Sequence, residues 1–291
     1  MPTLKHHNFF TPKTMKRTRS QTNSNSISIN KLQPQIKTLI SSKIPFPAKK
    51  IPKLATKNKK PILPPSSPSP PPPPIAKPLS TTGEIETALN HLRAADPLLS
   101  TIINTFPSPQ FSNKITPFFS LIKTLISQQL SNKASSSIEN RFISLFDSQS
   151  SILPNAVLSL TPTQLREVGI SGPKATYIHD LSTKYANGFL SDSSILEMDD
   201  EMLYEKLTSV KGIGPWSVHM FMIFTLHRPD VLPVGDLVVR RGVEKLYGLK
   251  GLPSPSQMEI LCEKWKPYRS IGSWYMYRFV EAKGVLPNST T

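Results

Sequence analysis

The first acidic residue of the chain is Glu84, although fifteen lysines and arginines precede it. Residues 1–80 also hold 16 of the 30 prolines, many of them in the tract PPSSPSPPPPP. A segment of this composition cannot bury enough apolar surface to offset the entropy that ordering costs. We therefore predict a disordered basic tail, rich in Pro, Ser and Lys, over residues 1–81, a folded domain over residues 82–286 and a short C-terminal tail over residues 287–291.

The positive charge of the chain is concentrated in the predicted tail. Residues 1–83 carry +15 of the net +16, so the remaining 20 basic and 19 acidic residues leave the rest of the chain at +1. This division argues against a broad cationic surface on the domain. The clusters KRTR at 16–19 and PAKKIPKLATKNKK at 47–60 favour a nuclear import signal or, alternatively, a solvated tail that attracts nucleic acid without specificity. An organellar transit peptide is less favoured, because such peptides prefer arginine and lysine predominates here. We expect a nuclear protein.

Cysteine content and apolar runs exclude several classes of protein. A single cysteine, Cys262, cannot build a disulfide framework, an iron–sulfur cluster or a cysteine-rich zinc site. None of the six histidines belongs to a cluster with metal-ligand spacing. The longest apolar run, residues 220–226, is far shorter than the roughly 20 residues that span a bilayer. We expect a soluble, intracellular protein with no membrane partner.

Helical patterns extend over most of the chain after residue 82. The segment TPFFSLIKTLISQQL (116–130) places its apolar residues on one helical face. The pairs Thr161-Pro162 and Ser254-Pro255 are typical helix starts, and Asp199 is a further N-cap candidate. No segment in this region alternates as a strand does. The pattern predicts an all-α domain of about ten helices.

A glycine-rich turn, VKGIGPWS, lies between two of the predicted helices. Gly212 and Gly214 permit positive φ and the close approach of another backbone, and Pro215 suits the first turn of a helix. Free amides at a helix N-terminus favour an anion, so we expect a DNA phosphate here, with Lys211 adding charge. The alternative is an ordinary connection between helices. A similar sequence, LREVGISGPKATYI at 165–178, predicts a second, related hairpin.

Asp236 follows the turn VLPVG, 22 residues after Gly214. This position predicts the N-cap of a helix. A helix N-terminus stabilises an anionic side chain, and a carboxylate beside a pocket can also stabilise a cationic sugar or orient a water molecule. The two roles are compatible.

Taken together, GIGPWSVHMFM and RPDVLPVGDLVVRRG resemble the signature of the helix-hairpin-helix DNA glycosylase superfamily, in which this hairpin precedes a Gly/Pro-rich turn and an essential aspartate. LISQQLSNKAS (125–135) and KPYRSIGSWYMYRF (266–279) resemble its alkylation-repair branch, the 3-methyladenine DNA glycosylase II type. The resemblance covers residues 115–284. It implies a monomeric, all-α helix-hairpin-helix domain that binds double-stranded DNA containing a damaged base.

The resemblance also implies a mechanism. The damaged nucleotide leaves the duplex, and Asp236, the catalytic residue, stabilises the positive charge that develops on the sugar as the N-glycosidic bond breaks. Trp216 occupies the position of the nucleophilic lysine in members that also cut the backbone, and the four cysteines of iron–sulfur members are absent. We therefore expect a monofunctional glycosylase without a cofactor, and only a structural monovalent cation at the hairpin is left open.

Aromatic side chains are expected to line the base pocket, because their electron-rich faces attract a cationic base. By position, Trp216 and Tyr277 match pocket aromatics of bacterial relatives. Trp274 lies nearby in the sequence, with a place in the core as the alternative. Met220 departs from the pattern, because an aromatic is expected there, and this leaves the range of bases open.

The residue expected to fill the vacated position in the duplex is Gln129, with Gln128 and Leu130 as competitors and a polar helix end as the alternative. Together with Lys211, Gly212 and Gly214, Gln128 and Gln129 make up the predicted DNA-binding set. Two other classes of protein stay open: a helix-hairpin-helix DNA-binding module without chemistry, and an interaction protein in which the tail acts and the domain is a scaffold.

Overall fold

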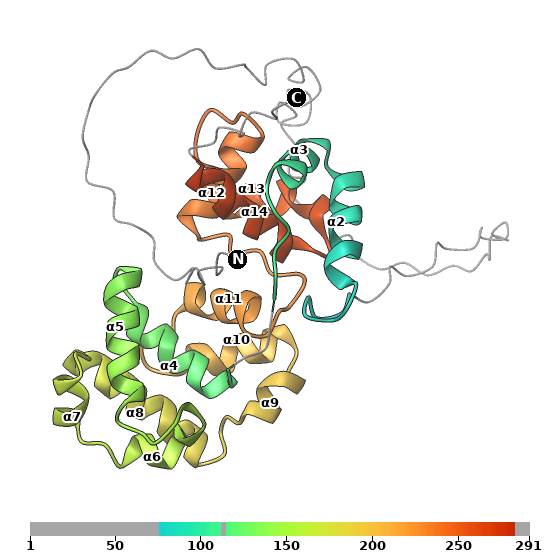
Figure 1. Cartoon of the computed structure of the whole chain (residues 1–291). Coiled ribbons are helices and arrows are strands. Elements are labelled where there is room, and N and C mark those ends of the chain that lie inside the picture. The colour runs from blue at the N-terminus through green and yellow to red at the C-terminus, as the bar shows by residue number, and fades with distance from the viewer. Residues whose placement is uncertain (1–75, 112–114, 283–291) are drawn as a thin grey trace, which may run out of the picture. The chain divides into compact units, whose positions relative to one another are not determined.

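The structure, a computed structural model, describes residues 76–111 and 115–282. Within these ranges the chain forms thirteen α-helices and two 3₁₀-helices and no strand (Figure 1). The predicted all-α fold class is confirmed. Most of the predicted tail, residues 1–75, and the predicted C-terminal tail, residues 287–291, lie outside the described residues.

The described helices fall into two groups, each with its own hydrophobic core (Figure 1). The first group comprises α4 (Pro117–Ser127), α5 (Asn132–Ile143), η2 (Gln149–Ser151), α6 (Pro154–Leu158), α7 (Pro162–Glu167), α8 (Gly172–Ala186), α9 (Asp192–Glu197), α10 (Asp200–Thr208) and α11 (Pro215–Phe224). The second group comprises α2 (Glu84–Ala95), α3 (Pro97–Thr105), α12 (Leu237–Leu246), α13 (Pro255–Leu261), η3 (Glu263–Trp265) and α14 (Arg269–Glu281). The first two helices of the domain therefore pack with the last ones.

Many helix starts follow local chemistry that the sequence displays. Proline occupies the first turn of α3, α4, α6, α7, α11 and α13, where its missing N–H costs no helical hydrogen bond. Thr161 and Ser254 form capping boxes, and Asp199 caps α10, so these predicted starts are confirmed. The described helices outnumber the predicted ten partly because α6 and α9 have only five and six residues, too few to display a helical period.

The chain before α2 already packs against the second core. Leu79 is completely buried there, and its amide donates a hydrogen bond to the carbonyl of His227 at 2.8 Å. Residues 76–81 fall in the predicted tail, but this contact attaches them to the domain. A single leucine among prolines and polar residues carries no periodicity that would reveal such a contact in the sequence.

A buried carboxylate, Asp96, joins the parts of the second group. Its Oδ1 accepts hydrogen bonds from two amides in the first turn of α3, at 3.1 and 3.3 Å. Its Oδ2 accepts from the Tyr247 hydroxyl at 2.5 Å and from the Trp265 indole at 2.8 Å, and the Lys264 ammonium lies 3.3 Å away. These contacts connect the start of α3 to the end of α12 and to η3.

Helices α12 and α14 approach each other closely at Gly242. A Cβ atom added there would lie 2.6 Å from the Cβ of Met276 and 3.1 Å from its Cα. Only glycine fits this position without moving a helix. Because Asp236 is the N-cap of α12 and α14 carries Tyr277, this contact sets the distance between two elements of the predicted site.

Substitution Gly242→Ala is expected to lower the free energy of unfolding by about 1 kcal/mol or more, because overpacking outweighs the gain in helix propensity. Urea denaturation measures the change. Gly251→Ala is the control, since Gly251 is exposed and an added Cβ there meets no atom within 4 Å. Equal stability of the two variants would show that α12 and α14 separate without cost.

Candidate active site

Asp236 caps α12, as its position after the PVG turn predicts. Its Oδ1 accepts hydrogen bonds from the amides of Val238 and Val239, both at 2.8 Å. These amides belong to the first turn of the helix, where no backbone carbonyl is available to them. The residue is buried, with 6% of its surface exposed. The start of the helix therefore holds the carboxylate where little solvent reaches it.

The second oxygen of Asp236 binds side chains from two other helices. Its Oδ2 accepts a hydrogen bond from Trp216 Nε1 at 2.5 Å and another from the Tyr277 hydroxyl at 2.8 Å. Trp216 lies in the first turn of α11 and Tyr277 in α14. Tyr277 packs against both hydrophobic cores. The carboxylate therefore lies where the two groups of helices meet.

The chemistry of Tyr277 suits it to donate this hydrogen bond. Burial and then the negative charge of Asp236 raise the pKa of the Tyr277 hydroxyl well above its ordinary value. The hydroxyl therefore keeps its proton at physiological pH. All four partners of Asp236 are donors, and a group that accepts from four donors acts as a carboxylate and not as a carboxylic acid.

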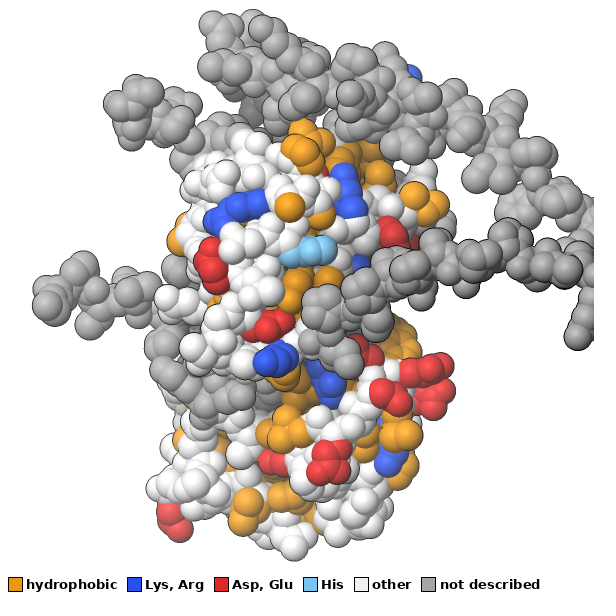
Figure 2. Space-filling model, turned by 90° about the vertical axis from the view of Figure 1, so that its right-hand side faces the viewer, with side chains coloured by type: hydrophobic (Ala, Val, Ile, Leu, Met, Phe, Trp, Pro, Cys, Tyr) orange, Lys and Arg blue, Asp and Glu red, His pale blue; other side chains and the backbone are white. Residues whose placement is uncertain are grey.

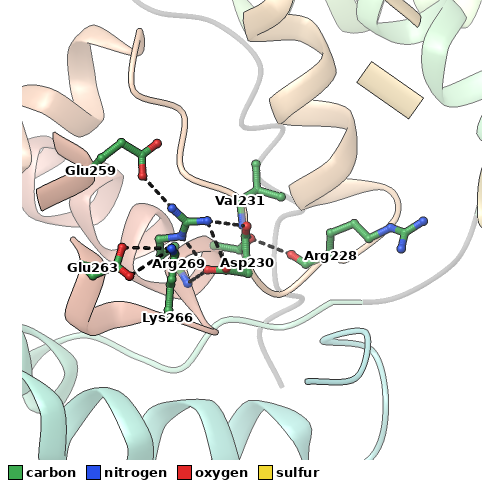
Figure 3. Close-up of polar contacts among 8 residues, drawn as sticks. Arg228, Asp230, Val231, Glu259, Glu263, Lys266 and Arg269 are labelled. Atoms are coloured by element: carbon green, nitrogen blue, oxygen red, sulfur yellow. Dashed lines mark hydrogen bonds and ion pairs between the residues drawn. The ribbon is translucent and has the colours of Figure 1, made fainter. Parts of the chain in front are cut away.

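A polar network holds the loop that leads from α11 to Asp236. Arg269, the first residue of α14, contacts the two carboxylate oxygens of Asp230 at 2.6 and 3.0 Å (Figure 3). The buried hydroxyl of Ser270 donates to a carbonyl of the loop at 2.6 Å and accepts from a loop amide at 2.9 Å, both within residues 228–231. The loop is therefore fixed to α14, the helix that also supplies a side chain to Asp236.

Two other residues of the predicted pocket have different surroundings. Trp274 is buried in the second core, edge-on to Tyr275 with the ring centroids 5.0 Å apart, and the Arg278 guanidinium lies 4.9 Å from its ring centroid. Met220 is buried, and its Sδ lies 3.3 Å from the Tyr277 hydroxyl oxygen, whose single proton is directed to Asp236. A thioether therefore lies beside Tyr277 where the sequence pattern leads us to expect an aromatic ring.

The predicted hairpin, Lys211–Gly214, connects α10 to α11 and rests against α8. Gly212 has a φ of +82°, and a Cβ added there would lie 2.2 Å from the ring of Tyr177. Asp180 accepts a hydrogen bond from the Lys211 amide at 3.0 Å, and its other oxygen lies 3.8 Å from the Lys211 ammonium. The positive φ and the contact with Tyr177 thus require glycine at position 212, whether or not DNA is bound. Lys211 forms an ion pair with Asp180 although its side chain is 66% exposed.

Gly214 differs from Gly212, because it faces open space. A Cβ added to Gly214 meets no atom within 4 Å, and as the N-cap of α11 it offers no side chain to the amides of the first turn. Such amides bind anions well. The geometry at Gly214 is therefore compatible with the predicted approach of a DNA phosphate.

The predicted gap-filling residue lies in the loop between α4 and α5. Gln129 is exposed and has a φ of 59°, in the left-handed region. The neighbouring Gln128 donates a hydrogen bond from Nε2 to the carbonyl of Gly212 at 2.7 Å. The structure thus brings the two predicted DNA-contacting segments together. The carbonyl of Gly212 thus already accepts a hydrogen bond within the protein. A structural monovalent cation at the hairpin stays a prediction. In the described ranges no group of three or more His, Cys, Asp or Glu residues is placed to hold a metal ion.

Helix α8 supplies residues that the sequence argument missed. The second predicted hairpin precedes this helix, and its Gly169 has a φ of +96°, which matches that of Gly212. From α8, Tyr177 and Asp180 support the first hairpin, and Lys174 binds the loop that carries the predicted gap-filling residue. The only signal for these roles in the sequence was the similarity of the two hairpins.

Charged side chains are scattered over the face shown in Figure 2, where Lys and Arg alternate with Asp and Glu. This distribution agrees with the net charge of +1 for residues 84–291. Phosphate binding through backbone amides needs no broad basic surface. Over the same described part of the chain, no helix is both long enough and apolar enough to cross a membrane.

Comparison with known proteins identifies the fold family. Residues 122–267, which contain the hairpin and Asp236, match the family described as HhH-GPD superfamily base excision DNA repair protein. The chain belongs to this superfamily. Membership places Asp236, Trp216 and the hairpin in the segment that defines the family.

Members of the superfamily from fission yeast resemble most of the domain. The chain is 31% identical over 204 residues to DNA-3-methyladenine glycosylase 1 of Schizosaccharomyces pombe, which covers 67% of this chain and 89% of the relative. It is 29% identical over 208 residues to the alkylbase DNA glycosidase-like protein mag2 of the same organism, covering 69% and 96%. A solved structure of an S. pombe 3-methyladenine DNA glycosylase in complex with abasic DNA superposes with a TM-score of 0.58 at 30% identity, covering 67% of this chain and 97% of that one.

The two hairpin glycines are expected to respond differently to alanine. Gly214→Ala changes the free energy of unfolding by no more than about 1 kcal/mol, the size of an N-cap preference, but lowers affinity for duplex DNA by about tenfold or more, because the methyl group displaces a phosphate from the amides. Gly212→Ala destabilises the fold by about 2 kcal/mol or more, through strain at positive φ and the clash with Tyr177. Urea denaturation and fluorescence anisotropy with a labelled duplex measure the two effects. Wild-type affinity of Gly214→Ala would place the phosphate contact elsewhere.

Proposed function

We propose that this protein is a DNA glycosylase that extrudes N-alkylated purine nucleotides from the duplex and hydrolyses their N-glycosidic bond. The observation that carries the proposal is the carboxylate of Asp236, held by four donors at the junction of the two cores. The relatives support the same substrate class, since one is named DNA-3-methyladenine glycosylase 1 and the solved structure of another contains abasic DNA, the product of base excision.

The chemistry assigned to Asp236 follows from charge. An N-alkylated purine is cationic and leaves readily, and positive charge moves to the sugar as its bond breaks. A fixed anion close to the sugar stabilises this charge without needing to reorganise. Both oxygens of Asp236 are already oriented by the protein, which is the condition for such preorganised stabilisation.

Trp216 and Tyr277 act in two ways in this proposal. Each donates a hydrogen bond to Asp236 through its polar atom, and each has an aromatic face that can contact a cationic base through cation–π attraction. Only 6% of Asp236 is exposed. A nucleotide therefore reaches the carboxylate when one of these aromatic side chains moves aside, and binding of the base is coupled to opening of the site.

A DNA-binding module without chemistry is the second candidate function. The near-complete closure of Asp236 favours it, because a carboxylate saturated by four donors can serve as a structural cap alone. The two candidates differ in one measurable outcome, the release of free base from damaged DNA.

Asp236→Asn is expected to reduce single-turnover base release by about 100- to 1,000-fold, the size of one lost transition-state contact, or about 2.7–4 kcal/mol. Asparagine is also a good N-cap, so α12 keeps its start. The substrates are duplexes with 3-methyladenine, 7-methylguanine, 1,N6-ethenoadenine, hypoxanthine or uracil, and the free base is quantified. Urea denaturation and DNA affinity serve as controls for folding. Release of base at the wild-type rate would contradict the role of Asp236, and no release by the wild-type protein would favour the binding module.

We also propose that the enzyme is monofunctional, because Trp216 offers no amine for a Schiff base. The nearby Lys211 is paired with Asp180. After base release, the DNA strand is expected to stay intact at the abasic site until alkali is added, and borohydride is expected to trap no protein–DNA adduct. Denaturing gels of both reactions measure this. A trapped adduct lost in Lys211→Gln would identify Lys211 as a nucleophile and overturn the assignment.

We also propose nuclear localisation. Its support is the pair of basic clusters at 16–19 and 47–60, which lie outside the described residues. Monomeric binding to duplex DNA is likewise proposed and fits the single candidate site in the described domain.

A further inference from the structure

The loop Gln128–Leu130, the wedge loop, is bound by one lysine from helix α8. Lys174, in the first turn of α8, donates hydrogen bonds from its ammonium to the carbonyls of Ile126 and Gln128, both at 2.7 Å. These carbonyls lie at the C-terminal end of α4, where helical partners are lacking and the helix dipole favours a cation. Lys174 is half-buried, and its ammonium is directed to the backbone of this loop.

The wedge loop has an unfavourable backbone conformation at its tip. Gln129 has a φ of 59°, and a residue with a Cβ atom enters this left-handed region only at a cost in free energy. The side chain of Gln129 is exposed. Such a conformation persists where surrounding contacts enforce it. Lys174 supplies two of these contacts, because it holds the carbonyl of the preceding residue and that of Ile126.

A cavity of about 230 Å³ lies between the wedge loop and the second hairpin, and Gln129, Leu130, Gly169 and Lys174 are among its lining residues. On the other side, Gln128 binds the carbonyl of Gly212. Hydrogen bonds therefore hold the loop from two sides, through Lys174 and through the Gly212 carbonyl, and the Lys174 ammonium is the charged member of this set.

We propose that Lys174 is a positioning residue: it fixes the wedge loop so that Gln129 projects in the conformation that enters the duplex. This rests on the proposed function, in which a nucleotide is extruded and its place is filled. A loop held in its bound conformation loses less entropy on insertion. Lys174 acts through the loop and does not itself touch the reacting atoms.

The test compares affinity for two uncleavable duplexes, one undamaged and one with a tetrahydrofuran abasic site, at fixed salt. The ratio of the two affinities reports insertion at the vacated position, whereas phosphate contacts contribute to both duplexes. Lys174→Met is expected to lower this preference by about tenfold with little change in affinity for undamaged DNA. Lys174→Arg, which keeps charged donors for the carbonyls, restores the preference to within about threefold of wild type.

Two further variants separate positioning from other effects. Gln129→Ala is expected to lower the preference similarly. The double variant Lys174→Met/Gln129→Ala is expected to show no further loss, because both substitutions remove the same function, insertion of Gln129. Lys133→Met is the charge control, since Lys133 is exposed in the first turn of α5. This variant weakens binding to both duplexes alike, as loss of a phosphate contact does.

Several outcomes would overturn the proposal. These are an unchanged preference in Lys174→Met, an equal loss of affinity for both duplexes, or additive effects of Lys174→Met and Gln129→Ala. If Lys174→Met does not fold, as urea denaturation shows, Lys174→Ala carries the same test, because it also removes both donors and keeps a good helix former in α8. A protein that releases no base but shows the expected ratios contradicts only the proposed function, and one that releases base with unchanged ratios contradicts only this inference.

Discussion

Two hydrogen bonds from different helices converge on one oxygen of Asp236, one from the Trp216 indole and one from the Tyr277 hydroxyl. The other oxygen caps α12. The bonds require α11 from one group of helices and α12 and α14 from the other to meet at a single point. Residues outside the site help to bring these helices together. Gly242 lets α12 approach α14, and Ser270 fixes the loop that leads from α11 to Asp236.

The same donor set occurs a second time in the domain, around Asp96. Both aspartates cap a helix with one oxygen, and with the other accept from a tryptophan indole and a tyrosine hydroxyl. Asp96, however, is 0% exposed and has the Lys264 ammonium beside it. The set of donors therefore defines a stable way to hold a carboxylate. What distinguishes Asp236 is its place between the two cores. Among the described side chains, no cation pairs with it.

The predicted DNA-contacting segments form one assembly around α8. Tyr177 and Asp180 support the hairpin, and Lys174 supports the wedge loop. Gln128 then connects the two. Because each contact is a packed ring or a hydrogen bond of short length, the hairpin and the wedge loop are held in a defined relation to each other. In the proposed DNA complex, a phosphate bound at the hairpin would therefore place the wedge loop in a defined position relative to the duplex.

The sequence alone determined those features that depend on a few neighbouring residues. Proline and capping residues marked helix starts, periodicity marked the all-α class, and the PVG turn placed Asp236 at an N-cap, because the decisive interactions span no more than one helical turn. Only the tertiary structure decided which side chains meet Asp236. Trp216 and Tyr277 lie 20 and 41 residues from it, and Gln128 lies 84 residues from its partner Gly212. The structure also placed Trp274 in the second core. Such contacts depend on how whole helices pack, and no local pattern along the chain encodes the relative placement of two helices.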